Sequence, residues 1–309
     1  MGSLHRPRWG SLQFWPRKRA RKEIPSVNWN AFEKSSAKNH LLGYIGYKVG
    51  MKSALVKDNT PHSLTKGKTI VMPVTVIECP PLKVYSIRLY KNGQVVAEII
   101  SSSIEKELKK VLKIPKNPKN AEKDFDDVRL IIYSLSKKTE IKKTPDIIEA
   151  GLTGNAQEKL EFAKGILNRE INFDEFFDKN QLVDIHAVTK GKGFSGPVKR
   201  FGITYRPHKS EKGVKKVGSI GPWHPARVTF RVAMAGQLGY FTRVQYNNKI
   251  INFGKEMPLE FLHYGNVKTN YVLIKGSVQG PAKRAIVMTS CSRPKKETAK
   301  GSFEFVKIL

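Results

Sequence analysis

The sequence predicts a mainly β protein in which a closed barrel is interrupted by long excursions. Many short segments rich in β-branched and aromatic residues are separated by Gly, Asn and Pro turns, a pattern typical of barrels. The 309-residue chain has a net charge of +30, yet residues 101–180 carry 16 Lys and Arg against 15 Asp and Glu. No repeat of fixed period occurs. The chain therefore divides into barrel strands, one nearly neutral insertion and strongly basic extensions.

Residues 1–40 form a basic N-terminal extension with little apolar periodicity. Trp9, Phe14 and Trp15 are interleaved there with seven basic residues between Arg6 and Lys22. A basic run of this kind can be a disordered tail or a localisation signal. The interleaved aromatics favour an arm that packs between RNA segments, because rings stack on bases while guanidinium groups hold phosphates.

Residues 41–100 are assigned to the first part of the barrel. Their β-branched and aromatic content predicts strands at 41–56, 69–79, 83–90 and 94–100. Asn92-Gly93 separates the last two, and this dipeptide favours the left-handed backbone of a two-residue hairpin turn.

Residues 101–180 form an insertion of mixed, mainly helical character. Apolar spacing predicts helices at 103–114, 145–152 and 156–167, and residues 128–135 fit a strand. The near balance of charge indicates that this insertion faces solvent while the basic remainder of the chain is docked on nucleic acid.

Strands resume after the insertion. A barrel strand is predicted at 181–190, and residues 241–309 supply the remainder of the barrel and a C-terminal segment. Around and within this last part, strands are predicted at 240–254, 270–280 and 284–290. Residues 191–240 form a basic central loop that is too poor in apolar residues to cover a core face at either period.

The central loop concentrates positive charge. Between Lys190 and Arg231 the chain holds eleven Lys and Arg residues and a single acid, Glu211. Such a segment would repel itself in water, so a polyanion is expected to order it. RNA is the favoured partner because its regularly spaced phosphates can neutralise the run along its whole length.

A glycine pattern leaves an enzyme as the alternative function. Gly191 to Gly196 reads GKGFSG, which matches dinucleotide-binding loops and would suit a nucleotide-dependent or RNA-modifying enzyme. That use requires a helix opening directly after the loop, so that its N-terminus faces the phosphates. Pro197, Gly202 and Pro207 make such a helix implausible.

Other catalytic and metal-binding patterns are missing from the sequence. Lys66-Gly67-Lys68-Thr69 resembles the end of a P-loop, but His62 occupies the position of the required glycine. No two histidines have HExxH spacing, and no GxSxG elbow occurs. Cys79 and Cys291 are the only cysteines and form no CxxC pair. No catalytic residue, metal site or cofactor is therefore assigned.

Membrane and secretory signals are also missing. No run reaches the apolar length of a membrane span, and the N-terminus has no apolar signal region. We expect a soluble cytoplasmic protein with no membrane partner and no small-molecule substrate.

Six stretches of the chain resemble ribosomal large-subunit proteins of the universal L-three family, in its archaeal and eukaryotic form. The stretches are residues 9–22, 41–51, 74–84, 188–202, 216–243 and 261–284. They cover both ends and the centre of the chain and include the motif GPWHPA at 221–226, whereas insertion 101–180 matches loosely. The length resembles archaeal members, which are shorter than typical eukaryotic members and longer than bacterial ones.

The resemblance implies a six-stranded translation-protein-like β-barrel that lies on ribosomal RNA. It implies a structural constituent of the large ribosomal subunit rather than an enzyme. The implied partners are large-subunit ribosomal RNA and neighbouring large-subunit ribosomal proteins. Members of this family help nucleate subunit assembly and brace RNA near the peptidyl transferase centre through the central loop.

The residues expected to contact RNA are cationic and aromatic side chains of the two extensions, with three cations of the final barrel segment. They are Arg6, Arg8, Trp9, Trp15, Arg17, Lys18, Arg19, Arg21, Lys22, Lys190, Lys192, Lys199, Arg200, Arg206, Lys215, Lys216, Trp223, His224, Arg227, Arg231, Arg243, Lys283 and Arg284. Trp223 has two interpretations. Pro222 and Pro225 stiffen its turn and would present it on a rigid tip, but a Trp can also anchor a protein core.

Overall fold

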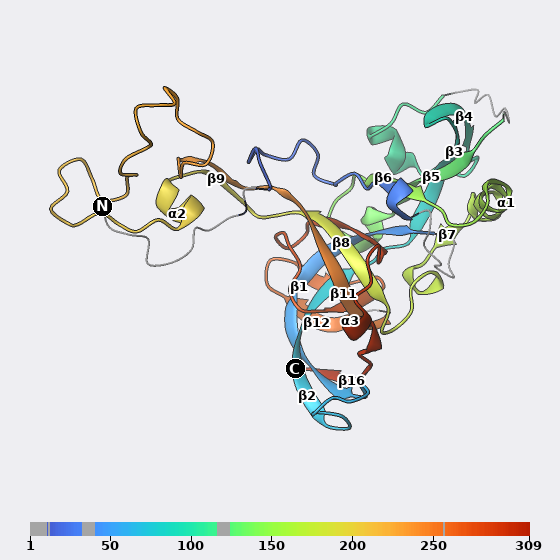
Figure 1. Cartoon of the computed structure of the whole chain (residues 1–309). Helices are drawn as coiled ribbons and strands as arrows, with labels where there is room; N and C mark the ends of the chain where they lie inside the picture. Colours follow the sequence, from blue (N-terminus) through green and yellow to red (C-terminus); the bar gives the residue numbers. More distant parts are fainter. Residues whose placement is uncertain (1–10, 12, 33–40, 116–123, 256) are drawn as a thin grey trace. The chain divides into compact units, whose positions relative to one another are not determined.

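The computed structural model describes residues 11, 13–32, 41–115, 124–255 and 257–309. The chain divides into two compact units (Figure 1). We call residues 1–22 and 189–242 the loop unit, and residues 23–188 and 243–309 the sheet unit. The predicted mainly β fold is confirmed, because strands make up most of the regular structure in the described ranges.

The sheet unit contains a seven-stranded sheet with the order β15-β8-β11-β14-β2-β1-β16. β1 also pairs antiparallel with β15, which places Gly43 opposite Thr289 and Tyr47 opposite Ala285. The strands are β1 (Gly43–Asp58), β2 (Thr69–Glu78), β8 (Leu182–Val188), β11 (Thr242–Gly254), β14 (Tyr271–Lys275), β15 (Ala285–Ser290) and β16 (Phe303–Ile308). A small hairpin of β12 (Met257–Phe261) and β13 (Gly265–Val267) and the short helix α3 (Lys296–Lys300) complete this region.

A second sheet of five strands is built around β3. Its order is β4-β3-β5-β6, and β7 pairs with β3. The strands are β3 (Leu82–Lys91), β4 (Gln94–Ile100), β5 (Asp127–Ser134), β6 (Ile147–Gly151) and β7 (Glu170–Ile171). The helix α1 (Ala156–Ile166) and the 3-10 helices η2 (Lys106–Lys110), η3 (Ser136–Thr139) and η4 (Phe173–Glu175) lie between or beside them in sequence. The insertion therefore has mixed structure, and its strands join residues from the segment before it.

Two predictions for this region differ from the structure. The helix predicted at 145–152 is wrong, because Ile147–Gly151 is strand β6, with Ile147 opposite Tyr133 of β5. The segment 82–100 was expected to lie in the barrel, but β3 pairs with β4 on one side and with β5 on the other, in the second sheet. β3 and β4 form a local hairpin, and the apolar strand β5 pairs with the other edge of β3. β3 therefore has partners on both edges and does not pair with a strand of the larger sheet.

Two local signals are confirmed. Asn92 and Gly93 have φ values of 51° and 75°, as a two-residue hairpin turn requires, and they join β3 to β4. The helix predicted at 156–167 is α1. Its start is fixed by a capping box in which the Asn155 backbone N–H donates to the Glu158 carboxylate at 2.9 Å.

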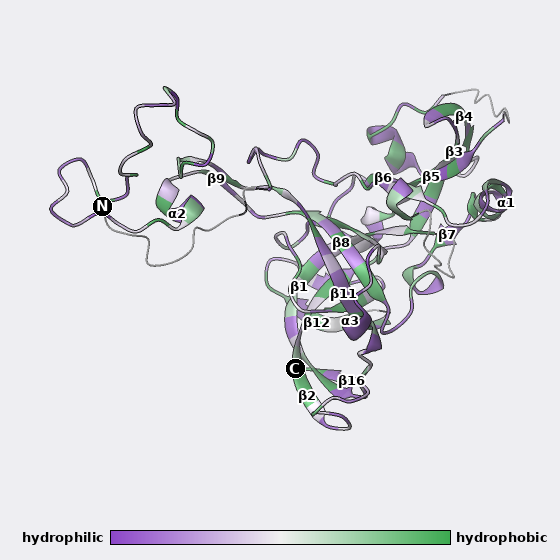
Figure 2. Cartoon of the chain, viewed as in Figure 1, coloured by the Kyte–Doolittle hydropathy of each residue, from purple (hydrophilic) through white to green (hydrophobic). Residues whose placement is uncertain are grey.

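One hydrophobic core joins the two sheets. It contains buried residues of β1, β8 and β15 together with residues of β3, β5, β6 and α1. Buried tyrosines of β1 add polar links, since Tyr44 donates to the Pro80 carbonyl at 2.8 Å and Tyr47 bonds the Ser134 hydroxyl at 2.7 Å. Hydrophobic residues accordingly gather on the strands, whereas α3 is hydrophilic (Figure 2).

The end of the N-terminal extension belongs to this unit. The 3-10 helix η1 (Trp29–Phe32) buries Trp29 to 6% exposure, with the Phe32 ring centroid 5.9 Å away. The Trp29 ring lies over two glycines, because a Cβ on Gly43 would come within 2.6 Å of it and one on Gly151 within 3.0 Å. Gly43 opens β1 and Gly151 ends β6, so Trp29 packs where the two sheets approach each other. The extension predicted at 1–40 therefore includes a residue, Trp29, that anchors it to the sheet unit.

Candidate RNA interface

The central loop leaves and returns through a narrow two-stranded ribbon. β9 (Gly191–Ser195) pairs with β10 (Gly236–Gly239). Below the ribbon, the Tyr240 N–H donates to the Lys190 carbonyl at 3.1 Å. Gly239 has φ +68°, and a Cβ there would lie 2.0 Å from that same carbonyl oxygen, so only glycine fits. The root of the loop is thereby fixed while its body carries the charge.

The N-terminal arm packs onto the loop within the same unit. Trp15 lies 6.0 Å from the Phe201 ring and 5.8 Å from the Phe230 ring. The Arg17 guanidinium stacks 4.4 Å from the Phe201 centroid, and its Nη1 donates to the Arg200 carbonyl at 3.3 Å. We call these four side chains, Trp15, Arg17, Phe201 and Phe230, the arm–loop cluster. It gives the two basic extensions a shared apolar contact that their sequences alone did not indicate.

Arg200 organises the backbone of the loop. Its Nε donates to the Gln237 carbonyl at 3.0 Å and its Nη1 to the Met234 carbonyl at 3.0 Å. Partial burial lowers the pKa of its guanidinium. Arg206 has a comparable position, because it is half-buried and its Nη2 donates to the Val217 carbonyl. These two cations hold loop segments together within the protein.

The remaining predicted residues of the loop unit project into solvent. The exposed set, which we call the cationic face residues, is Lys18, Arg19, Arg21, Lys22, Lys190, Lys192, Lys199, Lys215, Lys216, Trp223, His224, Arg227 and Arg231. Glu211 is the single acid between Lys190 and Arg231. Exposed cations with almost no anionic neighbour form an electrostatic surface suited to phosphates.

Exposed aromatic rings accompany these cations. Trp223 is 88% exposed, which rules out the core-anchor interpretation. Phe194 on β9 is 82% exposed and Tyr205 is 60% exposed. A large ring held in water gains free energy when it stacks on a base, and stacking tolerates any base because each has a π face. Phe194 and Tyr205 were missed from sequence, although both stand among glycines and cations as Trp223 does.

Three predicted residues lie in the sheet unit, and three lie outside the described residues. Lys283 is exposed. Arg284 is 8% exposed, with its Nη1 3.0 Å from the Glu23 carboxylate, and Arg243 on β11 is half-buried with its pKa lowered by burial. Arg6, Arg8 and Trp9 fall in the range 1–10, which the structure does not describe.

The glycine pattern at 191–196 does not build a dinucleotide loop. Gly191–Ser195 is strand β9 rather than a phosphate-binding turn. A helix after this loop was predicted to be implausible, yet the short helix α2 (Pro197–Phe201) begins there with its proline in the first turn. A proline is tolerated at that position since its missing N–H would have no helical partner. The helix has only five residues, and Gly202 ends it in the left-handed conformation with φ 64°.

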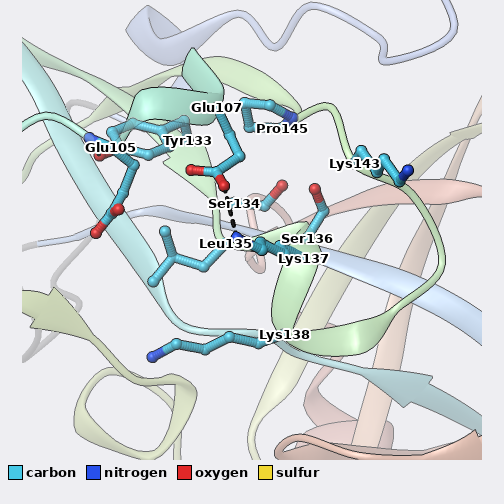
Figure 3. A pocket seen from close by; sticks show the side chains of 10 residues that line it. All are labelled: Glu105, Glu107, Tyr133, Ser134, Leu135, Ser136, Lys137, Lys138, Lys143 and Pro145. Atoms are coloured by element: carbon cyan, nitrogen blue, oxygen red, sulfur yellow. Dashed lines mark hydrogen bonds and ion pairs between the residues drawn. The ribbon is translucent and has the colours of Figure 1, made fainter.

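A pocket in the insertion has the wrong electrostatics for acid–base catalysis (Figure 3). It lies between η2, β5 and η3, and its two carboxylates are already paired. Lys137 Nζ is 2.8 Å from Glu107, and Lys83 Nζ is 2.6 Å from Glu105. The hydrogen bond that Lys137 donates lowers the pKa of Glu107, and the hydrogen bond that Lys83 donates to Glu105 raises the pKa of Lys83. Both shifts move away from neutrality, where a general acid or base is effective.

Metal and thiol chemistry find no support in the described ranges. No group of three or more His, Cys, Asp or Glu side chains there could hold a metal ion. Burial raises the pKa of Cys291 to about 11 and raises that of Cys79 as well, so both thiols stay protonated near neutral pH. None of the helices in this part of the chain combines the length and the apolar character needed to cross a membrane.

Comparisons with known proteins identify the family to which this chain belongs. The family model described as Ribosomal protein L3 matches residues 1–306. The protein named large ribosomal subunit protein uL3 from Archaeoglobus fulgidus is 40% identical over 313 residues, covering 94% of this chain and 93% of the relative. Its namesakes from Methanococcoides burtonii and Methanocaldococcus jannaschii are each 40% identical, over 96% of this chain and 94% and 95% of their own. The chain belongs to the ribosomal protein L3 family.

Proposed function

We propose that this chain is a structural constituent of the large ribosomal subunit that binds large-subunit ribosomal RNA in the cytoplasm. The observation that carries the proposal is the loop unit, where exposed cations and rings stand on a fixed root with almost no acid among them. Family membership supports the assignment to the large ribosomal subunit, because the matched relatives are named large ribosomal subunit proteins. Neighbouring large-subunit ribosomal proteins are the further partners.

The side chains of the loop unit divide into two roles in this proposal. The lysines, arginines and His224 among the cationic face residues contact phosphates, and Trp223, the remaining member of that set, stacks on bases or riboses. Trp15, Arg17, Arg200 and Arg206 serve mainly to hold the arm and loop in shape, as their contacts within the protein support. A preorganised loop loses less conformational entropy on binding than a free one.

The seven-stranded sheet supports a six-stranded barrel. The pairings β15-β8-β11-β14-β2-β1 return to β15 through β1, while β16 adds only to β1. A circuit of this kind leaves no free edge among the six strands. In this interpretation the central loop is a connection between β8 and β11, so the barrel fixes both ends of the RNA-binding segment.

The loop tip is proposed to brace RNA near the peptidyl transferase centre, and the protein to help nucleate subunit assembly. Pro222 and Pro225 flank Trp223 and restrict the backbone on both sides of it. In this proposal RNA carries out peptide transfer, and this chain holds the surrounding RNA in position. The paired charges of the insertion pocket agree with a protein that is not an enzyme.

Fractionation of a cell lysate on a sucrose gradient tests the assignment to the particle. We expect the chain to sediment with large subunits and to stay there until high salt strips RNA-bound proteins. The alternative, a nucleotide-dependent enzyme, predicts that the isolated chain binds ATP or S-adenosylmethionine in a calorimetric titration. Sedimentation at the top of the gradient together with such binding would overturn the proposal.

Trp223→Ala is expected to leave folding intact and to damage ribosome function. The side chain is 88% exposed, so its loss should change the free energy of unfolding by under about 0.5 kcal/mol. Large subunits carrying the variant should assemble but show altered tRNA or elongation-factor handling, or altered sensitivity to peptidyl-transferase inhibitors. Normal translation by such subunits would contradict the proposed placement of the tip.

A further inference from the structure

The turn that joins β1 to β2 is ordered around one buried carboxylate. Asp58 is 4% exposed and accepts hydrogen bonds from the Thr60 N–H at 2.9 Å, the Ser63 hydroxyl at 2.7 Å and the Thr65 hydroxyl at 2.5 Å. The Asp58 carbonyl also accepts from the Gly67 N–H at 2.7 Å. This turn, residues 57–69, is therefore internally cross-linked, and Figure 1 shows the hairpin extending to it beside β16.

The turn is also tied to the C-terminal segment. The Asn59 N–H donates to the Ser302 carbonyl at 2.9 Å, and the Ser302 N–H donates to the Thr60 hydroxyl at 3.2 Å. Hydrogen bonds from Thr60, Thr65 and Ser63 lower the pKa of Asp58. A depressed carboxyl pKa stabilises the fold above the unfolded-state pKa and loses that effect only as pH falls toward the folded value. The network is consequently intact throughout the neutral range.

The outer surface of the turn carries lysines and an exposed leucine, in contrast to the buried carboxylate inside it. Thr60, Ser63 and Thr65 are half-buried against Asp58, whereas the residues between and after them point outward. Leu64 is 98% exposed. The side chains of Lys66 and Lys68 are also exposed, and Asp58, the single acid of the turn, faces inward. The turn thus presents to solvent one apolar side chain, Leu64, and two lysines, Lys66 and Lys68.

We propose that this β1–β2 turn is a second RNA contact of the chain, distinct from the loop unit. Lys66 and Lys68 would bind phosphates, and Leu64 would pack against an exposed ribose or base. The inference rests on the proposed function, because it requires that the chain binds ribosomal RNA. It gives a role to the Lys66-Gly67-Lys68-Thr69 segment, which is too incomplete to be a P-loop.

Charge and shape favour RNA over a protein partner for this turn. Glu304 of β16 is exposed and lies opposite Lys57, with its carboxylate 3.4 Å from the Asn59 side-chain amide. Lys66 and Lys68 still form an exposed cationic pair that matches a polyanion, whereas the buried cores of protein interfaces are depleted in lysine. A single projecting leucine supplies too little apolar area to be the core of such an interface. The fixed turn also suits RNA, because lysines on an ordered loop meet phosphates without a large entropy loss.

The test measures binding of the full chain to a large-subunit RNA fragment as a function of salt. Lys66→Ala with Lys68→Ala should reduce the slope of log affinity against log salt by about two, one for each lost phosphate contact. The matched control is Lys109→Ala with Lys110→Ala, which removes the same charge from exposed positions on η2 in the nearly neutral insertion. Leu64→Ala should weaken binding roughly threefold to tenfold and leave the slope unchanged.

A second measurement distinguishes the partner directly. A photo-crosslinking residue placed at position 64 in assembled large subunits should react with RNA. Crosslinks only to protein, or equal slopes for the turn variant and the η2 control, would overturn the RNA assignment of this turn. If wild-type chain neither binds RNA nor sediments with large subunits, the proposed function itself fails, which is a different and recognisable outcome.

Discussion

Affinity of the free chain for large-subunit RNA is expected to fall by roughly three to five decades between about 50 and about 200 mM salt. The physical reason is counterion release, because each phosphate that a Lys or Arg neutralises frees condensed cations whose return at high salt opposes binding. With about eight to ten phosphates engaged, the slope of log affinity against log salt should be steep. Electrophoretic mobility or fluorescence titrations at four or five salt concentrations measure it.

Matched variants separate the cationic face from charge in general. Lys18→Ala, Arg19→Ala and Arg21→Ala together should lower the slope by about three, because all three side chains are exposed on the arm. Arg17 is left in place, since it belongs to the arm–loop cluster. Removing Lys109, Lys110 and Lys113 from the insertion changes the net charge equally and should leave the slope nearly unchanged. Equal slopes for both triple variants would mean that overall charge, not this face, drives binding.

Trp29→Ala should produce the largest loss of stability among single substitutions at the tryptophans in the described ranges. The ring is almost fully buried over Gly43 and Gly151, where the two sheets of the sheet unit approach. Truncating a buried Trp costs about 3–5 kcal/mol through lost burial and the cavity left behind. The free energy of unfolding, taken from denaturant titration of the RNA-free chain, measures the effect.

Trp223→Ala is the control for that measurement. The two substitutions remove the same side chain, but one ring is 6% exposed and the other 88%. Only the buried one should shift the denaturation midpoint. A similar midpoint for both variants would show that Trp29 is not the anchor that its packing indicates.

Sequence predicted the parts of this molecule that depend on local pattern or on net charge. Nine strands were expected close to where they occur, because β-branched residues and turn dipeptides mark them independently of their partners. The basic loop and its exposed Trp223 could be predicted as well, since no apolar neighbours were available to bury the ring. These features need no knowledge of the rest of the chain.

Features that depend on distant partners could not be predicted. Residues 147–151 contain a short apolar run that fits helix or strand equally, and pairing with β5 decides the outcome. Trp29 looked like part of a basic tail, although Phe32 three residues later was a weak sign of an apolar face. Its partner Gly43 follows 14 residues later and its partner Gly151 follows 122 residues later, so this packing depends on the tertiary fold.

The position of β1 has a consequence for how the chain is synthesised. β1 (Gly43–Asp58) pairs with β15 and β16, which begin at Ala285 and Phe303 near the other end of the chain. Those ladders cannot form until translation is almost complete, whereas the hairpin of β3 and β4 can form early. One edge of β1 must wait unpaired while the whole basic segment 189–242 emerges. An unpaired strand edge next to a growing polycationic segment is prone to associate with other chains and with RNA. Because the ladders of β1 join residues far apart in sequence, we expect this protein to fold slowly and to require protection of that edge during synthesis.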